Sequence, residues 1–478
     1  MSHKSLTRRS LIRNAALMSV GAALGPTALA RKAQAATVPS VLVHTMLYGG
    51  SDMRFLFAPM PGSPTAEAYF TARNPIYTMR FDGGLQPYGT YEELFDGEYL
   101  TATYGGESFG IHKSAAWLHD RFTAGKAAIV ANAVLATNRR HDHAQLMMLA
   151  GSTDVPRNDF NRSGWGGRLA EALNPGMVVS CAPRVPVFCQ GTSGLNRFEP
   201  LVHLENSRKF GLPYGTGREG GPNRILSRAL TAYYAARGPE VLATTDDRPD
   251  RILFEHEHAL RSRGDGFNAR LQSVMPTAPE VIENLRMSTS PVADGAFSRG
   301  IANLYDALLA ADILNMRVVY LDRIDWDTHS QERDKVVEGF TDLFSMDGGI
   351  ATLERELAVS NPDAVGKLTY TFGSDFGRQI ASNGDNGTDH GDGTYSVLVG
   401  DQVRGGVYGE MFPLAEIATD ATGTSPYTRN GSGIVGRTDL ARVFGTACNW
   451  LQQGAADTVF PGWNSTALET GVTLDLFS

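Results

Sequence analysis

The sequence has little cysteine, and beyond its first residues it has no long uninterrupted apolar run. Only three of the 478 residues are Cys (Cys181, Cys189 and Cys448), too few for a disulfide framework and without zinc–thiolate spacing. No stretch past the N-terminus reaches the roughly 18 apolar residues that a membrane helix needs. We therefore expect no stable membrane span once the N-terminal segment has been cleaved.

Basic clusters are also missing from most of the chain. Residues 36–478 contain 37 Lys and Arg against 51 Asp and Glu. A surface this acidic does not match the phosphate backbone of nucleic acid, so we expect no nucleic-acid partner. The 42% hydrophobic and 20% charged residues are typical of a folded chain. The 52 Gly indicate many turns and exclude a simple helical bundle.

The N-terminus has the features of an export signal. Arg8 and Arg9 lie in a basic segment, residues 14–30 form a mildly apolar run, and Ala-Gln-Ala at 33–35 is a small-x-small cleavage site. This resembles a twin-arginine (Tat) signal peptide over residues 1–35. It predicts passage through the Tat translocase, a mature chain beginning near Ala36, and a periplasmic or otherwise exported protein. The alternative, an amphipathic first helix of the mature fold, does not explain the order of these features.

Short apolar runs alternate with polar loops and helical segments along the rest of the chain. This pattern predicts an α/β fold whose central, mostly parallel sheet is covered by helices on both faces. Residues 60–110, rich in Gly, Tyr and Thr, are expected to be irregular, and the polar residues 203–295 to form an inserted lobe with helical pieces. The predicted strands lie near 40–47, 127–134, 316–321, 367–372 and 395–399.

Acidic residues and histidines follow several of these strands. Open α/β sheets bind ligands beyond the carboxyl ends of their strands, and carboxylate oxygens with imidazole nitrogens suit ions such as Zn or Mn. We therefore predict a divalent metal site, with one or two ions per chain. The candidate ligands are Asp52, Asp327, His329, Asp375, Asp389 and His390.

Four of these residues also have an alternative interpretation. An Asp at a strand end, such as Asp52 or Asp375, is commonly a helix cap or a turn former. His329 can be a structural histidine, and Asp389 can belong to a solvated turn or a loose calcium loop. Capping does not explain why so many strand ends carry such residues, which favours the metal site.

Several motifs together make the sequence recognisable. From about residue 40 to 415 it resembles the twin-arginine-exported family of unknown function numbered fifteen hundred and one, within the alkaline phosphatase/sulfatase-like superfamily. The matching segments are Leu47–Asp52, Ser163–Arg168, Trp326–His329, Ser374–Arg378, Gly387–Gly391 and Arg404–Gly409.

The resemblance implies a division of the ligands between two metals. Asp52 and Asp375 would hold one ion, and Asp327, His329 and His390 the other. Asp389 would be either a ligand or the partner that orients His390. Phe376 stands where the superfamily often has a histidine for the second metal, so that metal would be weakened or lost.

Two further residues are candidates for catalysis. His141, in the segment Arg139–His143, would orient an anionic substrate or act as a general base; the alternative is a charged helix start. Arg378 would hold a phosphate or sulfate, or would pair with a local carboxylate. No Ser or Thr stands at the position of a nucleophile.

These observations lead to three hypotheses about residues 36–478, an alkaline phosphatase-like α/β domain with a predicted insertion at about 203–295. In the first, the protein is an exported metal-dependent hydrolase of phosphate or sulfate esters, with a small-molecule or glycan substrate. In the second, it keeps the fold without catalysis and binds a metal or a glycan. In the third, it is a structural or surface-assembly protein.

Overall fold

The computed structural model describes most of the chain beyond the N-terminal segment. Contacts between Cα atoms set Ala36–Ser478 apart as one compact unit. The predicted signal peptide lies outside the described residues. No helix in the described part is long and apolar enough to cross a membrane. The described residues are 38–77, 88–159, 162–173, 176–192, 201–210, 222–243, 249–288, 295–421, 435–464 and 473–478.

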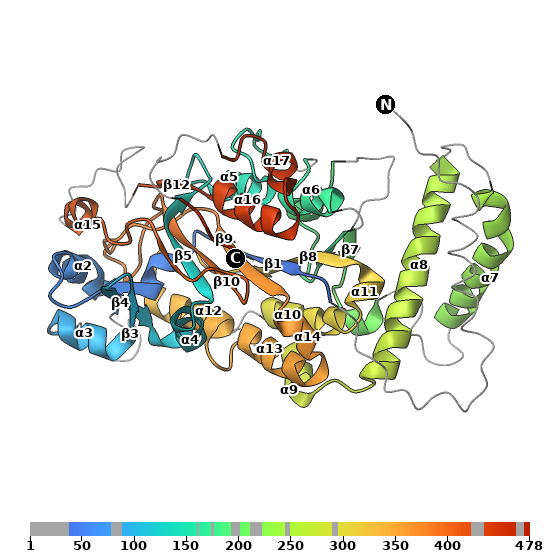
Figure 1. Ribbon diagram of the computed structural model, residues 1–478, viewed down its shortest axis with the longest axis horizontal. Helices are drawn as coiled ribbons and strands as arrows, with labels where there is room; N and C mark the ends of the chain where they lie inside the picture. The colour runs from blue at the N-terminus through green and yellow to red at the C-terminus, as the bar shows by residue number, and fades with distance from the viewer. Residues whose placement is uncertain are drawn as a thin grey trace. The chain divides into compact units, whose positions relative to one another are not determined.

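A nine-stranded mixed sheet forms the centre of the fold (Figure 1). All its strand pairs are parallel except the two made by β10. All five predicted strands belong to it, so the prediction of an α/β fold with a mostly parallel sheet is confirmed. In spatial order the strands are β11 (Gly406–Tyr408), β5 (Ala127–Val134), β10 (Thr394–Gly400), β9 (Leu368–Ser374), β1 (Val41–Leu47), β8 (Met316–Arg323), β6 (Met177–Ser180) and β7 (Leu201–His203), with β12 (Thr438–Asp439) beside β5.

The direction of β10 follows from its connection to β9. Residues 375–393 join the two strands without a helix. A parallel neighbour needs a crossover of a dozen or more residues, usually a helix, whereas a loop can return the chain directly as an antiparallel strand. This loop carries several of the candidate site residues.

Both faces of the sheet are covered, as the buried strands require. Side chains alternate between faces along a strand: Val41 and Val43 of β1 belong to one hydrophobic cluster, while Leu42 and Met46 belong to the other. Figure 1 shows the corresponding two groups of helices on opposite sides of the sheet. One group is α5 (His141–Ala150), α6 (Trp165–Ala172), α16 (Leu440–Leu451) and α17 (Ala455–Val459); the other includes α10 (Gly295–Leu308), α12 (Glu332–Phe344) and α13 (Gly349–Ser360).

Residues 57–112 contain a second, three-stranded antiparallel sheet, so the expectation of irregular structure over 60–110 was wrong. Its strands are β2 (Phe57–Pro59), β4 (Glu107–His112) and β3 (Tyr99–Tyr104). Gly105 and Gly106, with φ of 61° and 88°, make the turn between β3 and β4. Two glycines at positive φ are the signature of a tight hairpin, and Tyr and Thr favour strands. The helices α2 (Ala66–Arg73) and α3 (Tyr91–Glu98) belong to the same region.

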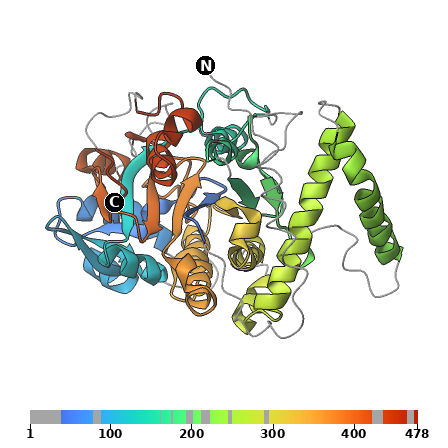
Figure 2. The same cartoon turned by 45° about the vertical axis from the view of Figure 1, so that its right-hand side comes forward.

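The polar stretch 203–295 is helical where it is described beyond β7. Its helices are α7 (Pro222–Leu242), α8 (Pro249–Val274) and α9 (Glu280–Arg286). In Figures 1 and 2, α7 and α8 run beside each other, and α8 also contacts α11 (Ala311–Leu314). That residues 203–295 are an insertion relative to a superfamily core stays a prediction.

Candidate metal centre

Three segments bring polar side chains to the carboxyl edge of the central sheet. They are the start of α5, the loop after β8 and the loop between β9 and β10. In the sheet, Leu47 of β1 pairs with Arg323 of β8 and with Ser374 of β9. The three parallel strands therefore end at the same level, and the loops that follow them meet.

The centre of this arrangement is a group of three side chains. His141, Asp327 and His390 each offer one ligand atom, and these atoms lie within 4.8 Å of one another. The Nε2 atoms of His141 and His390 are each 3.5 Å from an oxygen of Asp327. Metal–ligand bonds of about 2.0–2.2 Å allow ligand atoms at such separations around one ion.

His329 adjoins this group. Its Nε2 atom lies 3.0 Å from Nε2 of His390 and 3.2 Å from Oδ1 of Asp327. Its other nitrogen, Nδ1, lies 3.0 Å from Oδ1 of Asp389. Asp389 thus contacts His329 and not its chain neighbour His390, which differs from the expected pairing.

The Nδ1 atoms of the other two histidines also contact oxygen atoms. His390 Nδ1 lies 3.0 Å from the carbonyl oxygen of Arg139, and His141 Nδ1 lies 2.8 Å from Oδ2 of Asp375. Because a carbonyl or carboxylate oxygen only accepts, the hydrogen is on Nδ1 in each case. In the neutral imidazole, Nε2 then presents a lone pair, as in histidines that bind metal.

Asp375 is fully buried and orients His141 from behind. Its Oδ2 accepts a hydrogen bond from Gln145 Nε2 at 2.9 Å as well as the one from His141, and its Oδ1 accepts from Gly49 N at 3.3 Å. The candidate ligand Asp375 therefore lies behind an imidazole of the group, as second-sphere carboxylates do in metal sites.

Arg378 is fully buried, and its guanidinium donates hydrogen bonds to oxygen atoms of the protein itself. Its guanidinium donates to the carbonyl oxygens of Gly49, Gly50 and Thr388 at 2.7–2.8 Å and to Oδ1 of Asp327 at 2.5 Å. Of the two roles considered for Arg378, pairing with a local carboxylate is the one that this arrangement fits. The guanidinium is not exposed at the surface, where a substrate would contact it.

Asp52 lies outside the group, in a separate buried network. Its Oδ2 is 2.5 Å from Nη2 of Arg73, and both side chains are fully buried. Glu332 is also fully buried, and the charge of Asp52 acts on it. Arg54 extends the network to the metal-centre loop by donating to the carbonyl oxygen of Arg378 at 2.9 Å.

The charges around the group shift its pKa values in different directions. A hydrogen bond to Asp375 raises the pKa of His141. Burial, assisted by the charge of Arg378, lowers the pKa of His390 to about 4. Burial alone would raise the pKa of Asp327, but the hydrogen bond and charge of Arg378 outweigh it and lower it. Asp327 is thus ionised and His390 neutral near pH 7, which is the state that binds a cation.

The donor set fits a divalent transition metal. Two imidazole nitrogens and a carboxylate oxygen converge, and a third imidazole adjoins them. Nε2 of His141 is buried and makes no hydrogen bond within the described residues. Such nitrogen-rich sets suit Zn or Mn better than they suit calcium, which prefers ligands that are all oxygen.

The contacts of some residues in this region could not be predicted from the sequence. Gln145 is four residues after His141, which places both on one side of α5, and that spacing is the only clue to its role. Arg73 and Glu332 are far in sequence from Asp52, and nothing in their spacing predicts contact.

Comparison with known proteins gives two results. The family described as "Protein of unknown function (DUF1501)" matches residues 306–426, which span β8 to β11 and so include Asp327, His329, Asp375 and His390. The resemblance to that family is thereby confirmed over this part of the chain. A search of the curated proteins found no match.

Among solved structures, the chain is similar to one of BT4656 in complex with its substrate D-glucosamine-2-N,6-O-disulfate. The identity is 12% and the TM-score 0.27, over 83% of this chain and 79% of that one. A likeness at this level is distant and assigns no activity to this chain.

Proposed function

We propose that the protein is an exported, metal-dependent hydrolase of phosphate or sulfate esters, acting on a small molecule or a glycan. The observation that carries this proposal is the convergence of His141, Asp327 and His390 beyond the carboxyl ends of parallel strands. Export is inferred from the Tat-like residues 1–35 and the cleavage site before Ala36.

Three side chains would hold the ion: His141, Asp327 and His390, with His329 able to join them. When bound there, a divalent ion supplies Lewis acidity to an ester oxygen and lowers the pKa of a bound water. The chain itself orients the imidazoles through Asp375, Asp389 and the carbonyl of Arg139.

The start of α5 favours an anionic substrate. His141 is the first residue of this helix, and the preceding Arg140 makes no side-chain cap. Uncapped amide hydrogens and the helix dipole attract anions at such a terminus. The Arg140 side chain is 59% exposed, although Asp142 Oδ1 lies 3.7 Å from its Nε and balances part of its charge. This supports a phosphate or sulfate group as the reacting part of the substrate.

Direct attack by water agrees better with the surroundings than a covalent intermediate does. Thr328 and Thr388 are hydroxyl residues next to the candidate ligands, and both side chains are buried. A buried hydroxyl does not reach a substrate at the surface, whereas a nucleophile must contact the reacting atom.

A second candidate function is non-catalytic binding of a metal or glycan. The engagement of Arg378 with the protein's own oxygens favours this alternative, because its guanidinium does not extend to the anionic group of an ester. The two functions differ in whether ester cleavage accompanies a bound ion.

The test is elemental analysis of the exported protein, followed by a screen of p-nitrophenyl phosphate and sulfate with and without a chelator. We expect about one ion per chain in the wild type and in His143→Gln, and a much lower content in His390→Ala. His143 is a matched control, because it lies on α5 but contacts Asn138 and the carbonyl of Val155 instead of the group.

Ester cleavage that disappears with the ion supports the hydrolase. A bound ion without any cleavage of these esters supports the binding protein. Absence of an ion in wild-type protein, even after addition of Zn²⁺ or Mn²⁺, contradicts the hydrolase and the metal-binding protein, and leaves the glycan-binding protein.

A further inference from the structure

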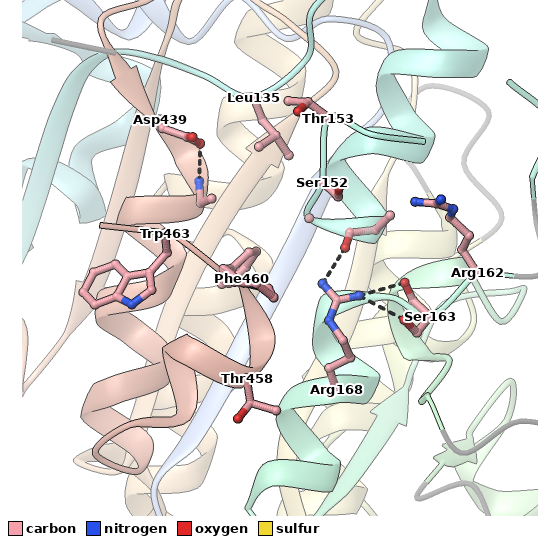
Figure 3. A pocket seen from close by; sticks show the side chains of 14 residues that line it. Leu135, Ser152, Thr153, Arg162, Ser163, Arg168, Asp439, Thr458, Phe460 and Trp463 are labelled. Carbon is pink, nitrogen blue, oxygen red and sulfur yellow. Dashed lines mark hydrogen bonds between the residues drawn. The ribbon is translucent and has the colours of Figure 1, made fainter. Parts of the chain in front are cut away.

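A second candidate site is a cavity of about 460 Å³ beside α6 and α16–α17 (Figure 3). Its wall includes Leu135, directly after β5, and Asp439, at the end of β12. These positions are again at the carboxyl edge of the sheet. The volume lies within the range of pockets that bind small molecules, roughly 300–1,000 Å³.

Arg168 is one of three charged residues in the wall of this cavity, with Arg162 and Asp439. Its guanidinium donates to the carbonyl oxygen of Val459 at 3.0 Å, to that of Ala150 at 2.7 Å, and to the carbonyl and hydroxyl oxygens of Ser163 at 2.9 and 3.2 Å. All these acceptors are neutral, and within the described residues no carboxylate forms an ion pair with it. Four contacts leave one of the five guanidinium hydrogens for another acceptor.

The charge of Glu171 acts on Arg168, but the two side chains form no ion pair within the described residues. Burial lowers the pKa of Arg168 to about 10, which still leaves it charged near pH 7. A partly buried cation without an anionic partner costs free energy, which an anionic ligand would offset.

Glycines hold Arg168 in place. The backbone of α6 approaches its neighbours so closely that a Cβ on Gly167 would lie 2.1 Å from the carbonyl oxygen of Gln190. A Cβ on Gly166 would lie 2.2 Å from the Phe188 ring. The motif Ser163–Arg168, one of the segments that make the sequence recognisable, thus builds this wall of the cavity and has no part in the metal centre.

The rest of the wall mixes hydroxyl groups with aromatic rings. Ser152 and Thr458 contribute hydroxyl groups, and Phe460 and Trp463 contribute rings. Figure 3 shows Asp439 and Trp463 on the α16 side and Arg168 on the α6 side. A pocket of this kind fits a ligand with an apolar face, several hydroxyl groups and an anionic substituent.

We propose that this cavity binds an anionic sugar residue, whose carboxylate or sulfate contacts Arg168 and whose ring packs on Phe460 and Trp463. Asp439, the N-cap of α16 through its bond from Ala441 N, lies across the cavity in position to accept hydrogen bonds from sugar hydroxyls. The site does not depend on the metal centre, so it stands whether or not the protein cleaves esters.

The experiment is ligand-observed NMR with the full chain and four probes: D-glucuronate, D-glucose 6-sulfate, D-glucose and inorganic sulfate. We expect the two anionic sugars to bind and glucose to bind at least about tenfold more weakly, as the loss of one charge-assisted hydrogen bond predicts. Carboxylate and sulfate sugars are compared directly, which identifies the preferred anion.

Two variants locate the binding. Arg168→Gln removes the charge and should weaken the anionic sugars about tenfold or more. Thr153→Trp places a large side chain at an exposed residue of the cavity wall and should block it without disturbing the Arg168 contacts. The second variant keeps the test valid if the first one fails to fold.

Three outcomes overturn the proposal. One is absence of binding by both anionic sugars. Another is binding that persists unchanged in Thr153→Trp, which would place it elsewhere. The third is inorganic sulfate binding as tightly as glucose 6-sulfate, which would reduce the cavity to a simple anion site.

Discussion

Two clusters of acidic side chains lie close to each other in this protein and have opposite surroundings. In the metal centre, Asp327 is 49% exposed and faces histidines as well as Arg378. In the buried network, Asp52 is fully buried and faces the guanidinium of Arg73. Both residues follow a strand of the central sheet. Both carboxylates contact an arginine, so the comparison shows that a strand-end carboxylate becomes a candidate ligand when imidazoles also lie in front of it.

The largest expected effect concerns the buried side of this comparison. Asp52→Ala leaves Arg73 charged and buried without its partner, which should lower the free energy of unfolding by about 3–5 kcal/mol. Urea unfolding followed by circular dichroism measures it. Asp327→Asn, the control, keeps an acceptor for Arg378 at a half-exposed position and should cost less than about 1 kcal/mol. Equal losses in both variants would show that the two clusters do not differ in this way.

The next effect concerns the orientation of the imidazoles. Asp375→Asn replaces the carboxylate that accepts the Nδ1 hydrogen of His141, and it should weaken Zn²⁺ binding about 10- to 100-fold. Competition with a chelating dye measures the affinity. Asp142→Asn is the matched control, because Asp142 lies on the same helix and pairs with Arg157. An unchanged affinity in Asp375→Asn would remove Asp375 from the description of the centre.

The smallest expected effect is a pH dependence within the buried network. Burial raises the pKa of Glu332 well above its usual 4.5, and the charge of Asp52 adds to this. The folded protein thus binds a proton here that the unfolded chain releases above pH 4.5. Stability from this group is therefore complete below pH 4.5 and falls as pH rises towards the raised pKa.

Glu332→Gln tests this, because the amide stays uncharged at every pH. Unfolding free energies of the two proteins, measured from pH 4.5 to 8, should diverge steadily, with the wild type losing stability relative to the variant. Parallel curves over that range would mean that Glu332 is not protonated in the folded protein.

Much of the fold was predictable because buried strands have a simple signature. Runs such as Val41–Leu47 and Ala127–Val134 are buried along their whole length, as both faces of the sheet are covered. The direction of β10 was not predictable from its own residues, since it depends on the absence of a helix in the preceding loop. The hairpin of β3 and β4 was missed although Gly105-Gly106 marks its turn.

The candidate site was predictable only in its general position. Strand ends identify Asp327 and His390, and the arrangement of parallel strands explains why they meet. Which carboxylate faces an imidazole depends on side chains from distant segments. Arg73 of α2 forms an ion pair with Asp52, whereas Asp375 accepts a hydrogen bond from His141. No spacing along the chain records these pairings.

The contacts of Arg378 bear on whether the protein folds before or after it binds a metal. Its bonds to Gly49, Gly50 and Thr388 join the loops after β1 and β9 through the protein's own atoms. The loops are therefore already ordered before a metal arrives, and binding does not have to supply the entropy cost of arranging them. An ion at this centre would enter and leave a folded protein, so we expect a chelator to remove it without unfolding the chain.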